Sequence, residues 1–257
     1  MRTALTIAGS DSGGGAGIQA DLKTFTALGL HGTSATTAIT AQNTRGISSV
    51  LALPPAIVVA QIEAVLEDFG ADAIKIGMLA NAEIASAVAE TLRGLDRTPI
   101  VLDPVMVAKG GASLLDDTAV DVLRWQLMPQ ATVVTANVPE AEALTGEPVR
   151  SVTDARRAAA ALVESGVRAV VIKGGHLAGD AVDVLFDGTT FTEFSGPRLN
   201  TRHTHGTGCT FAAAIAAHLA LGASLVAAVG AAKAYVTHAI AHAPGLGHGH
   251  GPLGPGS

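Results

Sequence analysis

Apolar and polar positions follow two alternating patterns along the chain, one typical of buried strands and the other of helices. Runs of branched and small residues predict strands at Ala4–Ala8, Thr33–Thr40, Ile47–Leu53, Ala73–Ile76, Ile100–Asp103, Thr132–Thr135 and Ala169–Ile172. Helical spacing predicts helices over Gly17–Leu28, Ile57–Phe69, Ala82–Leu92, Asp116–Leu127 and Thr153–Glu164, with two Ala-rich helices near the C-terminus. This alternation predicts an α/β fold in which helices cover both faces of a central, mostly parallel sheet.

Two short runs late in the chain have a different connection. Val182–Phe186 and Thr190–Phe194 are joined by Asp187-Gly188, a dipeptide typical of hairpin turns, and predict a short antiparallel hairpin at one edge of the sheet. No linker rich in proline or serine interrupts residues 1–243, so we expect a single domain there. Residues 244–257 form a Gly/His/Pro-rich tail, a composition that predicts disorder.

Composition restricts the possible partners and the compartment. The 257 residues carry 16 Lys and Arg against 22 Asp and Glu, a net charge of −6, and only 3% are aromatic. Non-specific nucleic-acid binding needs a basic surface, and base stacking needs aromatic side chains, so we expect no nucleic-acid partner. A single cysteine excludes a disulfide framework and a Cys-rich zinc site, and it favours the cytoplasm.

The stretch from Cys209 to Ala232 has no charged residue and is long enough to span a bilayer. Its apolar character comes mostly from alanine, however, and Gly222-Ala223-Ser224 interrupts it. We therefore expect two successive buried helices and no membrane span. At the N-terminus, Met1-Arg2-Thr3 leads directly into a short apolar strand, so we also expect no signal peptide.

Glycines and polar residues follow the ends of five predicted strands. These segments are Gly9-Ser10-Asp11, Gly77-Met78, Asp103-Pro104, Asn137 to Glu140, and Lys173 to His176. In open α/β sheets, ligands bind beyond the carboxyl ends of the strands. The segments are far apart in the sequence, but we expect them to meet at one rim of the sheet.

The first of these loops, Gly9–Gly17, suggests nucleotide binding but matches neither common motif. Its glycines do not have the dinucleotide spacing, and Gly15-Ala16 stands where a P-loop needs Lys-Ser or Lys-Thr. Two interpretations remain open: a tight strand-to-helix turn, or a loop whose backbone approaches a ligand closely.

A second glycine segment, His203–Thr210, precedes a long Ala-rich helix. Gly206 and Gly208 expose the backbone N–H groups of a first helical turn, a geometry suited to an anion such as a transferring phosphoryl group. Cys209 lies at the same turn, where the helix dipole is expected to lower the pKa of its thiol. The alternative is a buried structural cysteine.

Two acidic residues and one lysine complete the candidate chemistry. Asp103 and Glu140 are suited to holding Mg²⁺ through water, and Lys173 is suited to pairing with nucleotide phosphates. Each has a structural alternative: Asp103 as a turn residue, Glu140 as a first-turn helix acid, and Lys173 as a solvated surface lysine.

Seven segments in order carry a family resemblance. They are Gly9–Lys23, Ala41–Gly46, Lys75–Leu79, Asp103–Met106, Asn137–Ala141, Lys173–His176 and His203–Thr210. Together they closely resemble the bacterial hydroxymethylpyrimidine and hydroxymethylpyrimidine phosphate kinases of thiamine biosynthesis, over essentially residues 1–243. The resemblance implies a ribokinase-like three-layer sandwich, ATP with Mg²⁺ as phosphoryl donor, and a homodimer. It also implies that 4-amino-5-hydroxymethyl-2-methylpyrimidine is phosphorylated at its hydroxyl and then again to the diphosphate.

The same resemblance implies roles for individual residues. The pyrimidine pocket would be lined by Gly9, Asp21, Gln42 and Met78. The nucleotide and metal side would contain Asn137, Glu140 and Lys173, and the anion hole would contain Gly206, Gly208 and Cys209. Cys209 stands where related sugar kinases have an aspartate base.

The residue types suit this chemistry. The Gln42 amide both donates and accepts hydrogen bonds, so it can recognise an aminopyrimidine edge, and Met78 offers an adaptable wall for a flat ring. Only the first acceptor is an alcohol that benefits from a base, since a phosphate monoester has a second pKa near ~6. We therefore hypothesise that Cys209 matters more for the first transfer than for the second.

Three rival functions remain open from the sequence. Pyridoxal or pyridoxine kinase activity of the same fold is the nearest, because Gln42 and Met78 suit either heterocycle. A sugar kinase is disfavoured by cysteine in the anion hole. A non-catalytic nucleotide sensor is disfavoured because Asp103, Glu140, Lys173 and Cys209 are present together.

Overall fold

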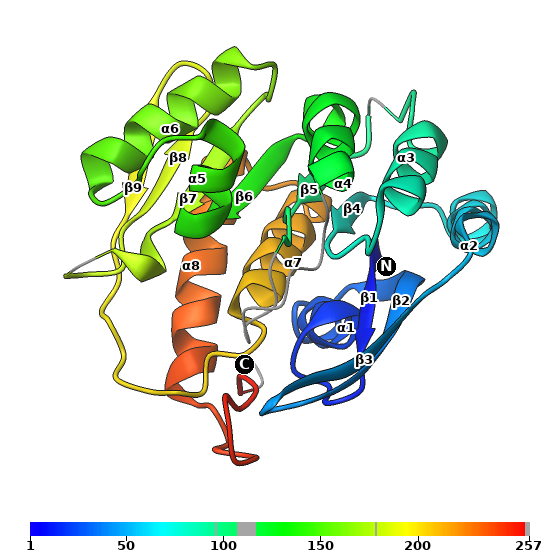
Figure 1. The fold of residues 1–257 in the computed structure, drawn as a ribbon, viewed down its shortest axis with the longest axis horizontal. Coiled ribbons are helices and arrows are strands. Elements are labelled where there is room, and N and C mark those ends of the chain that lie inside the picture. The colour runs from blue at the N-terminus through cyan, green and yellow to red at the C-terminus, as the bar shows by residue number, and fades with distance from the viewer. Residues whose placement is uncertain (96, 107–116, 178, 255–257) are drawn as a thin grey trace.

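The computed structural model describes residues 1–95, 97–106, 117–177 and 179–254. Its strands are β1 (Thr3–Asp11), β2 (His31–Asn43), β3 (Gly46–Ala52), β4 (Ala73–Ile76), β5 (Ile100–Leu102), β6 (Val133–Asn137), β7 (Val170–Lys173), β8 (Asp183–Phe186) and β9 (Phe191–Phe194). In these ranges they form one sheet in the order β3-β2-β1-β4-β5-β6-β7-β8-β9 (Figure 1). The strands from β2 to β7 in this order are parallel, which confirms the mostly parallel sheet.

Helices cover both faces of the sheet (Figure 1). One face packs against α1 (Gly17–Ala27), α7 (Thr207–Ala220) and α8 (Leu225–Ala241). The other packs against α2 (Pro55–Asp68), α3 (Ala82–Thr91), α4 (Asp117–Val122), α5 (Val138–Thr145) and α6 (Val152–Glu164). Two apolar cores result, one on each side, so the predicted three-layer arrangement is confirmed. A π turn, Leu123–Leu127, continues α4, and the predicted start of that helix at Asp116 lies outside the described residues.

Both edges of the sheet are antiparallel. At one edge β8 pairs with β7 and with β9, which confirms the predicted hairpin, and its turn is held by Asp187 Oδ1, which accepts from the amides of Thr189 and Thr190. At the other edge β3 turns back antiparallel on β2. The sequence predicted both segments as extended but not this pairing, because the connecting Thr44-Arg45 carries no typical hairpin dipeptide.

The long uncharged stretch is divided between two helices. Gly222 ends α7 in the left-handed region at φ +89°, and the chain turns back along α7 as α8. Among the described residues, no helix is both long and apolar enough to cross a membrane.

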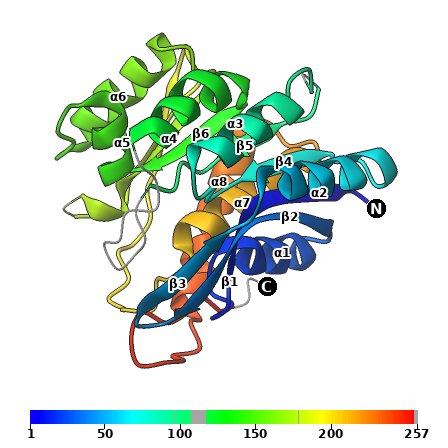
Figure 2. The same cartoon turned by 45° about the vertical axis from the view of Figure 1, so that its right-hand side comes forward.

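The tail departs from the expected disorder. Residues 244–254 pack against the domain, next to the β2–β3 turn and the end of α8 (Figure 2). The His250 amide donates to the Thr44 carbonyl at 2.8 Å, and the Gly254 amide donates to the Ala239 carbonyl at 2.9 Å. Backbone bonds of this kind need little side-chain specificity, so composition alone did not reveal them.

Candidate active site

A cavity of about 720 Å³ lies beyond the carboxyl ends of the parallel strands. It brings together nearly all of the site residues predicted from the sequence: Gly9, Gln42, Met78, Asp103, Asn137, Glu140, Lys173, Gly206, Gly208 and Cys209. Asp21 is the exception. The expected convergence of the strand-end segments on one rim is therefore observed.

Asp103, Glu140 and Lys173 form the charged centre of this cavity. Lys173 Nζ donates to Asp103 Oδ1 at 2.7 Å and lies 3.9 Å from Glu140 Oε2. Thr135 Oγ1 donates to the same Asp103 oxygen at 3.2 Å. Glu140 is held by a capping box at the start of α5, in which the Asn137 amide donates to Glu140 Oε2 at 2.7 Å and the Glu140 amide donates to Asn137 Oδ1 at 2.9 Å.

The two acids and the lysine perturb one another. Burial raises the pKa of the Glu140 carboxyl to about 7; Asp103 adds to the rise, whereas Lys173 opposes it. Burial opposes the charge on Lys173, but the two carboxylates outweigh burial and raise its pKa. The centre therefore holds a lysine whose positive charge is stabilised by two carboxyl groups, and the Glu140 carboxyl titrates near neutral pH.

The N-terminus of α7 meets this centre. Gly206 caps the helix in the left-handed region at φ +84°, and an added Cβ there would lie 1.8 Å from the Gly15 carbonyl oxygen. A Cβ on Gly208 would lie 3.3 Å from both Asp103 Oδ2 and Lys173 Nζ. The amides of a first helical turn have no carbonyl partner within their helix. Backbone donors and a lysine therefore face the same part of the cavity.

Cys209 corrects one prediction. The sequence predicts a lowered pKa for a thiol at a helix N-terminus, but burial raises the pKa of Cys209 to about 11. Lys75 opposes this rise without cancelling it. Cys209 is therefore a neutral thiol near pH 7, because the loss of hydration outweighs the helix dipole.

Asp21 lies beneath the cavity instead of lining it. Its side chain is fully buried, and Asp21 Oδ2 accepts from Lys75 Nζ at 2.8 Å and from Thr6 Oγ1 at 2.6 Å. Lys75 is also fully buried; although burial opposes its charge, Asp21 raises its pKa. Lys75 was not predicted as a partner, yet a lysine inside the apolar strand Ala73–Ile76 is a signal that a buried acid must lie opposite.

The remaining predicted residues lie at the other end of the cavity. A Cβ on Gly9 would lie 3.1 Å from Met78 Sδ, so the glycine lets the first strand come close to this sulfur without displacing it. Thr37 Oγ1 donates to the Met78 carbonyl at 2.6 Å, and this bond holds the backbone of Met78 in place. Gln42 extends from β2 and contacts Thr40 and His205 through its side-chain amide.

Two residues at this end were not among the predicted site residues. Asp11 Oδ2 lies 2.9 Å from His205 Nε2, and both residues line the cavity. Asp11 is in the glycine loop and His205 precedes α7, so both were inside quoted motifs. Their pairing joins positions 194 residues apart, which sequence spacing does not reveal.

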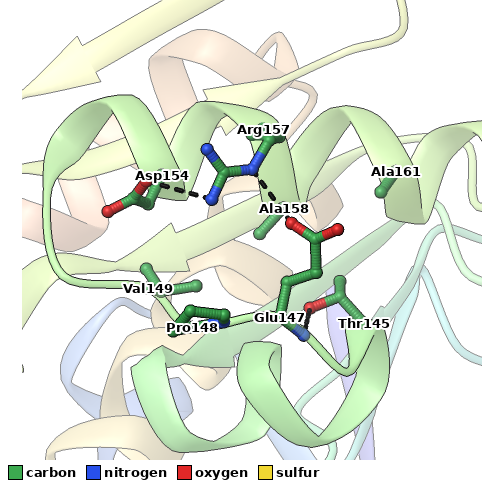
Figure 3. Close-up of a pocket in the computed structure, with 8 residues that line it drawn as sticks. All are labelled: Thr145, Glu147, Pro148, Val149, Asp154, Arg157, Ala158 and Ala161. Carbon is green, nitrogen blue, oxygen red and sulfur yellow. Dashed lines mark hydrogen bonds and ion pairs between the residues drawn. The ribbon is translucent and has the colours of Figure 1, made fainter.

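A second, smaller hollow of about 80 Å³ lies between α5 and α6 (Figure 3). Arg157 crosses it and pairs with Glu147 and Asp154, each at 3.0 Å. Arg157 and Glu147 are more than half exposed, and such ion pairs contribute little. This hollow is too small for a nucleotide, so the large cavity is the candidate active site.

The fold and the large cavity together define a class of protein. A mostly parallel α/β sheet and a helix N-terminus that meets a lysine and two carboxylates in a large cavity are features of a small-molecule kinase. The family model for phosphomethylpyrimidine kinase matches residues 11–254, and the chain belongs to this family.

Individual relatives agree with this assignment. A hydroxymethylpyrimidine/phosphomethylpyrimidine kinase from Streptomyces coelicolor is 55% identical, over 98% of this chain and 93% of its own. A thiamine biosynthesis bifunctional protein from Geobacter sulfurreducens is also 55% identical, and here the chain spans about half (51%) of the relative. The ADP complex of a Bacillus subtilis pyridoxal kinase superposes with a TM-score of 0.92 at 41% identity, covering 99% of this chain and 97% of the other. The ribokinase-like fold is confirmed by this likeness.

Proposed function

We propose that the protein phosphorylates 4-amino-5-hydroxymethyl-2-methylpyrimidine with ATP, and then phosphorylates the monophosphate to the diphosphate, for thiamine biosynthesis. The main structural support for this activity is that the N-terminus of α7 lies next to the Asp103–Lys173 pair inside the large cavity. Family membership and the names of the relatives supply the substrate. The ADP-bound neighbour supports ATP as the phosphoryl donor.

In this proposal the two ends of the cavity have different tasks. Gly9, Gln42 and Met78 hold the pyrimidine and aim its hydroxyl or phosphate at the start of α7. The first-turn amides at Gly208 and Cys209, together with Lys173, bind the negative charge that builds up on the transferring group. Asn137 and Gly206 position the nucleotide phosphates beside Lys173. Transfer of this kind depends mainly on positioning and on charge neutralisation.

Asp103 and Glu140 are the residues that would hold Mg²⁺. Mg²⁺ is bound through one or two carboxylates with several waters and substrate phosphates, and the two acids on either side of Lys173 Nζ fit that donor set. When bound, the ion supplies positive charge to the phosphate oxygens. Among the described residues no group of three or more His, Cys, Asp or Glu side chains could hold a metal alone, so the nucleotide would complete the coordination.

In this proposal the thiolate form of Cys209 takes the proton of the attacking alcohol, after the thiol has lost its own proton to solvent. A thiol with a pKa of about 11 holds its proton at neutral pH, but its thiolate is a strong base once formed. Lys75 lies close enough to favour the thiolate electrostatically. The phosphate acceptor of the second transfer is already an anion, so this proton removal applies only to the first.

Pyridoxal kinase activity is the second candidate, favoured by the TM-score of 0.92 to the Bacillus pyridoxal kinase. ATP consumption measured with the pyrimidine alcohol, its monophosphate and pyridoxal separates the candidates. We expect turnover of both pyrimidines, with pyridoxal as a slower acceptor. Turnover of pyridoxal alone would replace the main proposal by the second.

A cytoplasmic homodimer is the proposed state of the enzyme. On the exposed β2–β3 edge, Ile39 pairs with Leu51 across the two strands, and their exposed fractions are 49% and 62%. Large apolar side chains left in water favour association. Sedimentation should give a dimer that Leu51→Lys converts to a monomer, and a wild-type monomer would contradict the proposal. The single free cysteine suits a reducing compartment.

A further inference from the structure

Asp11, His205 and Gln42 form a connected chain at the acceptor end of the cavity. His205 Nε2 lies 2.9 Å from Asp11 Oδ2, and the same nitrogen lies 3.2 Å from Nε2 of the Gln42 amide. The Asp11 and His205 side chains are only 3% and 12% exposed, so water competes little for these contacts. One ring nitrogen is therefore shared between a carboxylate and an amide.

The surroundings of Asp11 decide where the proton of the ring lies. Asp11 Oδ1 accepts from the Gly13 amide at 2.8 Å, and Asp11 Oδ2 accepts from the amides of Gly15 at 3.0 Å and Ala16 at 2.9 Å. Burial alone would raise the pKa of the Asp11 carboxyl. The hydrogen bond from His205 and those from the backbone amides outweigh burial and lower this pKa. An ionised carboxylate only accepts hydrogen bonds, so His205 Nε2 must carry a proton.

This proton decides which way the Gln42 amide faces. Two N–H donors cannot share a hydrogen bond, so the amide nitrogen does not stay at 3.2 Å from a protonated His205 Nε2. A rotation of the amide by 180° places its carbonyl oxygen at His205 and its nitrogen at Thr40 Oγ1, which is 3.1 Å from the other end of the amide. Thr40 Oγ1 gives its own proton to the Ser10 carbonyl at 2.9 Å, so it is free to accept. In this orientation the single N–H of His205 Nε2 lies between two acceptors, Asp11 Oδ2 and the Gln42 carbonyl oxygen, as in a three-centre hydrogen bond. The Gln42 amino group then no longer faces another N–H donor.

The C-terminal tail fixes His205 in place. The His205 amide donates to the Gly251 carbonyl at 3.1 Å, and His205 forms a β-bridge with Pro252. A Cβ on Gly15 would lie 2.6 Å from His205 Cδ2 and 3.2 Å from Pro252 Cβ. The ring therefore lies between the glycine loop and the tail, with little space in which to turn.

We propose that His205, held by Asp11, is a positioning residue that turns the Gln42 carbonyl towards itself and the Gln42 amino group towards Thr40, and so fixes the order of acceptor and donor offered to the substrate ring. This inference rests on the proposed function for the identity of the ring. In this order the second lone pair of the carbonyl accepts from an exocyclic amine, and the second N–H donates to the adjacent ring nitrogen. An aminopyrimidine edge fits this order, with its amine on the His205 side.

The first test compares two substitutions at His205. His205→Leu removes the N–H donor, whereas His205→Gln keeps one at nearly the same distance from the backbone. We expect His205→Leu to raise KM for the hydroxymethylpyrimidine about tenfold, the loss expected for one oriented hydrogen bond, with KM for ATP unchanged. His205→Gln should stay within about twofold of the wild type on the same grounds. His218→Leu, the same change near the far end of α7, is the matched control and should not change either KM.

A double-mutant cycle then separates orientation from general damage. If His205 acts through Gln42, adding His205→Leu to Gln42→Ala should raise KM no further. An analogue of the pyrimidine without the exocyclic amine should bind the wild type and His205→Leu equally. Additive effects in the cycle, or equal losses with both substrates, would overturn the proposal.

The proton position is measurable without any substrate. In ¹⁵N NMR of histidine-labelled protein, the signal lost in His205→Gln should be that of a ring with a protonated Nε2. A bare Nε2 would overturn the inference even if the kinase activity is confirmed. Conversely, a protonated Nε2 in an enzyme that ignores the pyrimidine would leave the amide orientation intact and refute only the assigned substrate.

Discussion

Two lysine–aspartate pairs of nearly equal length serve the protein in different ways. Lys75 and Asp21 are joined at 2.8 Å and are completely buried beneath the cavity. Lys173 and Asp103 are joined at 2.7 Å, but the lysine keeps 14% of its side chain exposed to the cavity. The residue types and the distance are the same, so access to the cavity distinguishes a structural pair from one that can bind a ligand.

The largest effect is expected from breaking the buried pair. Lys75→Met leaves the Asp21 carboxylate without its cation in an apolar layer, and should lower the free energy of unfolding by about 3–5 kcal/mol. Urea unfolding measures this loss. The double variant Lys75→Met/Asp21→Leu should recover most of the stability, because no uncompensated charge remains. A single variant as stable as the wild type would show that the pair is not the structural one.

The same Lys→Met substitution in the Lys173–Asp103 pair should lower the rate of catalysis. Lys173→Met removes the cation facing the start of α7, and kcat should fall by about 10²–10³-fold, as for loss of one donor to a developing anion. The stability loss should be smaller than for Lys75→Met, because Asp103 can be hydrated from the cavity. Steady-state kinetics and urea unfolding on the two Lys→Met variants test the comparison directly. Equal behaviour of the two would refute it.

Glu140 makes the open centre sensitive to pH. The pKa of the Glu140 carboxyl is raised from the usual 4.5 to about 7 in the folded protein. Ionising Glu140 therefore lowers the free energy of unfolding, and this loss of stability grows as the pH rises from 4.5 to about 7. In metal-free protein, Glu140→Gln should be more stable than the wild type at pH 8 by up to about 3 kcal/mol, and this advantage should vanish at pH 4. Urea unfolding at both values measures it, with the exposed Glu63→Gln as control. A constant difference between the two pH values would contradict the raised pKa.

Cys209 should separate the two transfers. Cys209→Ala should lower the rate on the pyrimidine alcohol by about 100-fold, the usual size of a general-base contribution, and change the rate on the monophosphate much less. The wild-type rate on the alcohol should rise between pH 7 and pH 9 as the thiolate fraction grows below a pKa of about 11. The alanine variant should lose that slope. Equal losses on both acceptors would remove Cys209 from the proton transfer.

Local pattern was enough to predict the layers and the meeting point of the strand ends. Runs such as Ile100–Leu102 and Val170–Ile172 lie in buried strands because their residues are apolar on both faces, and parallel strands place their following loops at one rim. The extended run Ile47–Leu53 was predicted, but its antiparallel pairing with β2 was not, because the pairing depends on a turn without a characteristic dipeptide.

The features that we did not predict from the sequence depend on burial and on contacts between distant parts of the chain. We predicted that Asp21 lines the pocket. In the structure, however, Asp21 lies on the same buried face of α1 as Thr24 and Phe25, which packs next to the sheet. The pKa of Cys209 was predicted from the helix dipole alone, without the desolvation that outweighs it. The Asp11–His205 contact and the packed tail join distant parts of the chain, and no local signal marks them.

Whether one site carries out both transfers can be measured by ³¹P NMR of the wild-type protein with Mg²⁺, ATP and the hydroxymethylpyrimidine. We expect a monoester signal that appears first and is then replaced by the two coupled signals of a diphosphate. Lys173→Met should produce neither at a comparable rate. ADP formation without any pyrimidine diphosphate, or a product that stays at the monoester, would contradict the central claim that one site carries out both transfers.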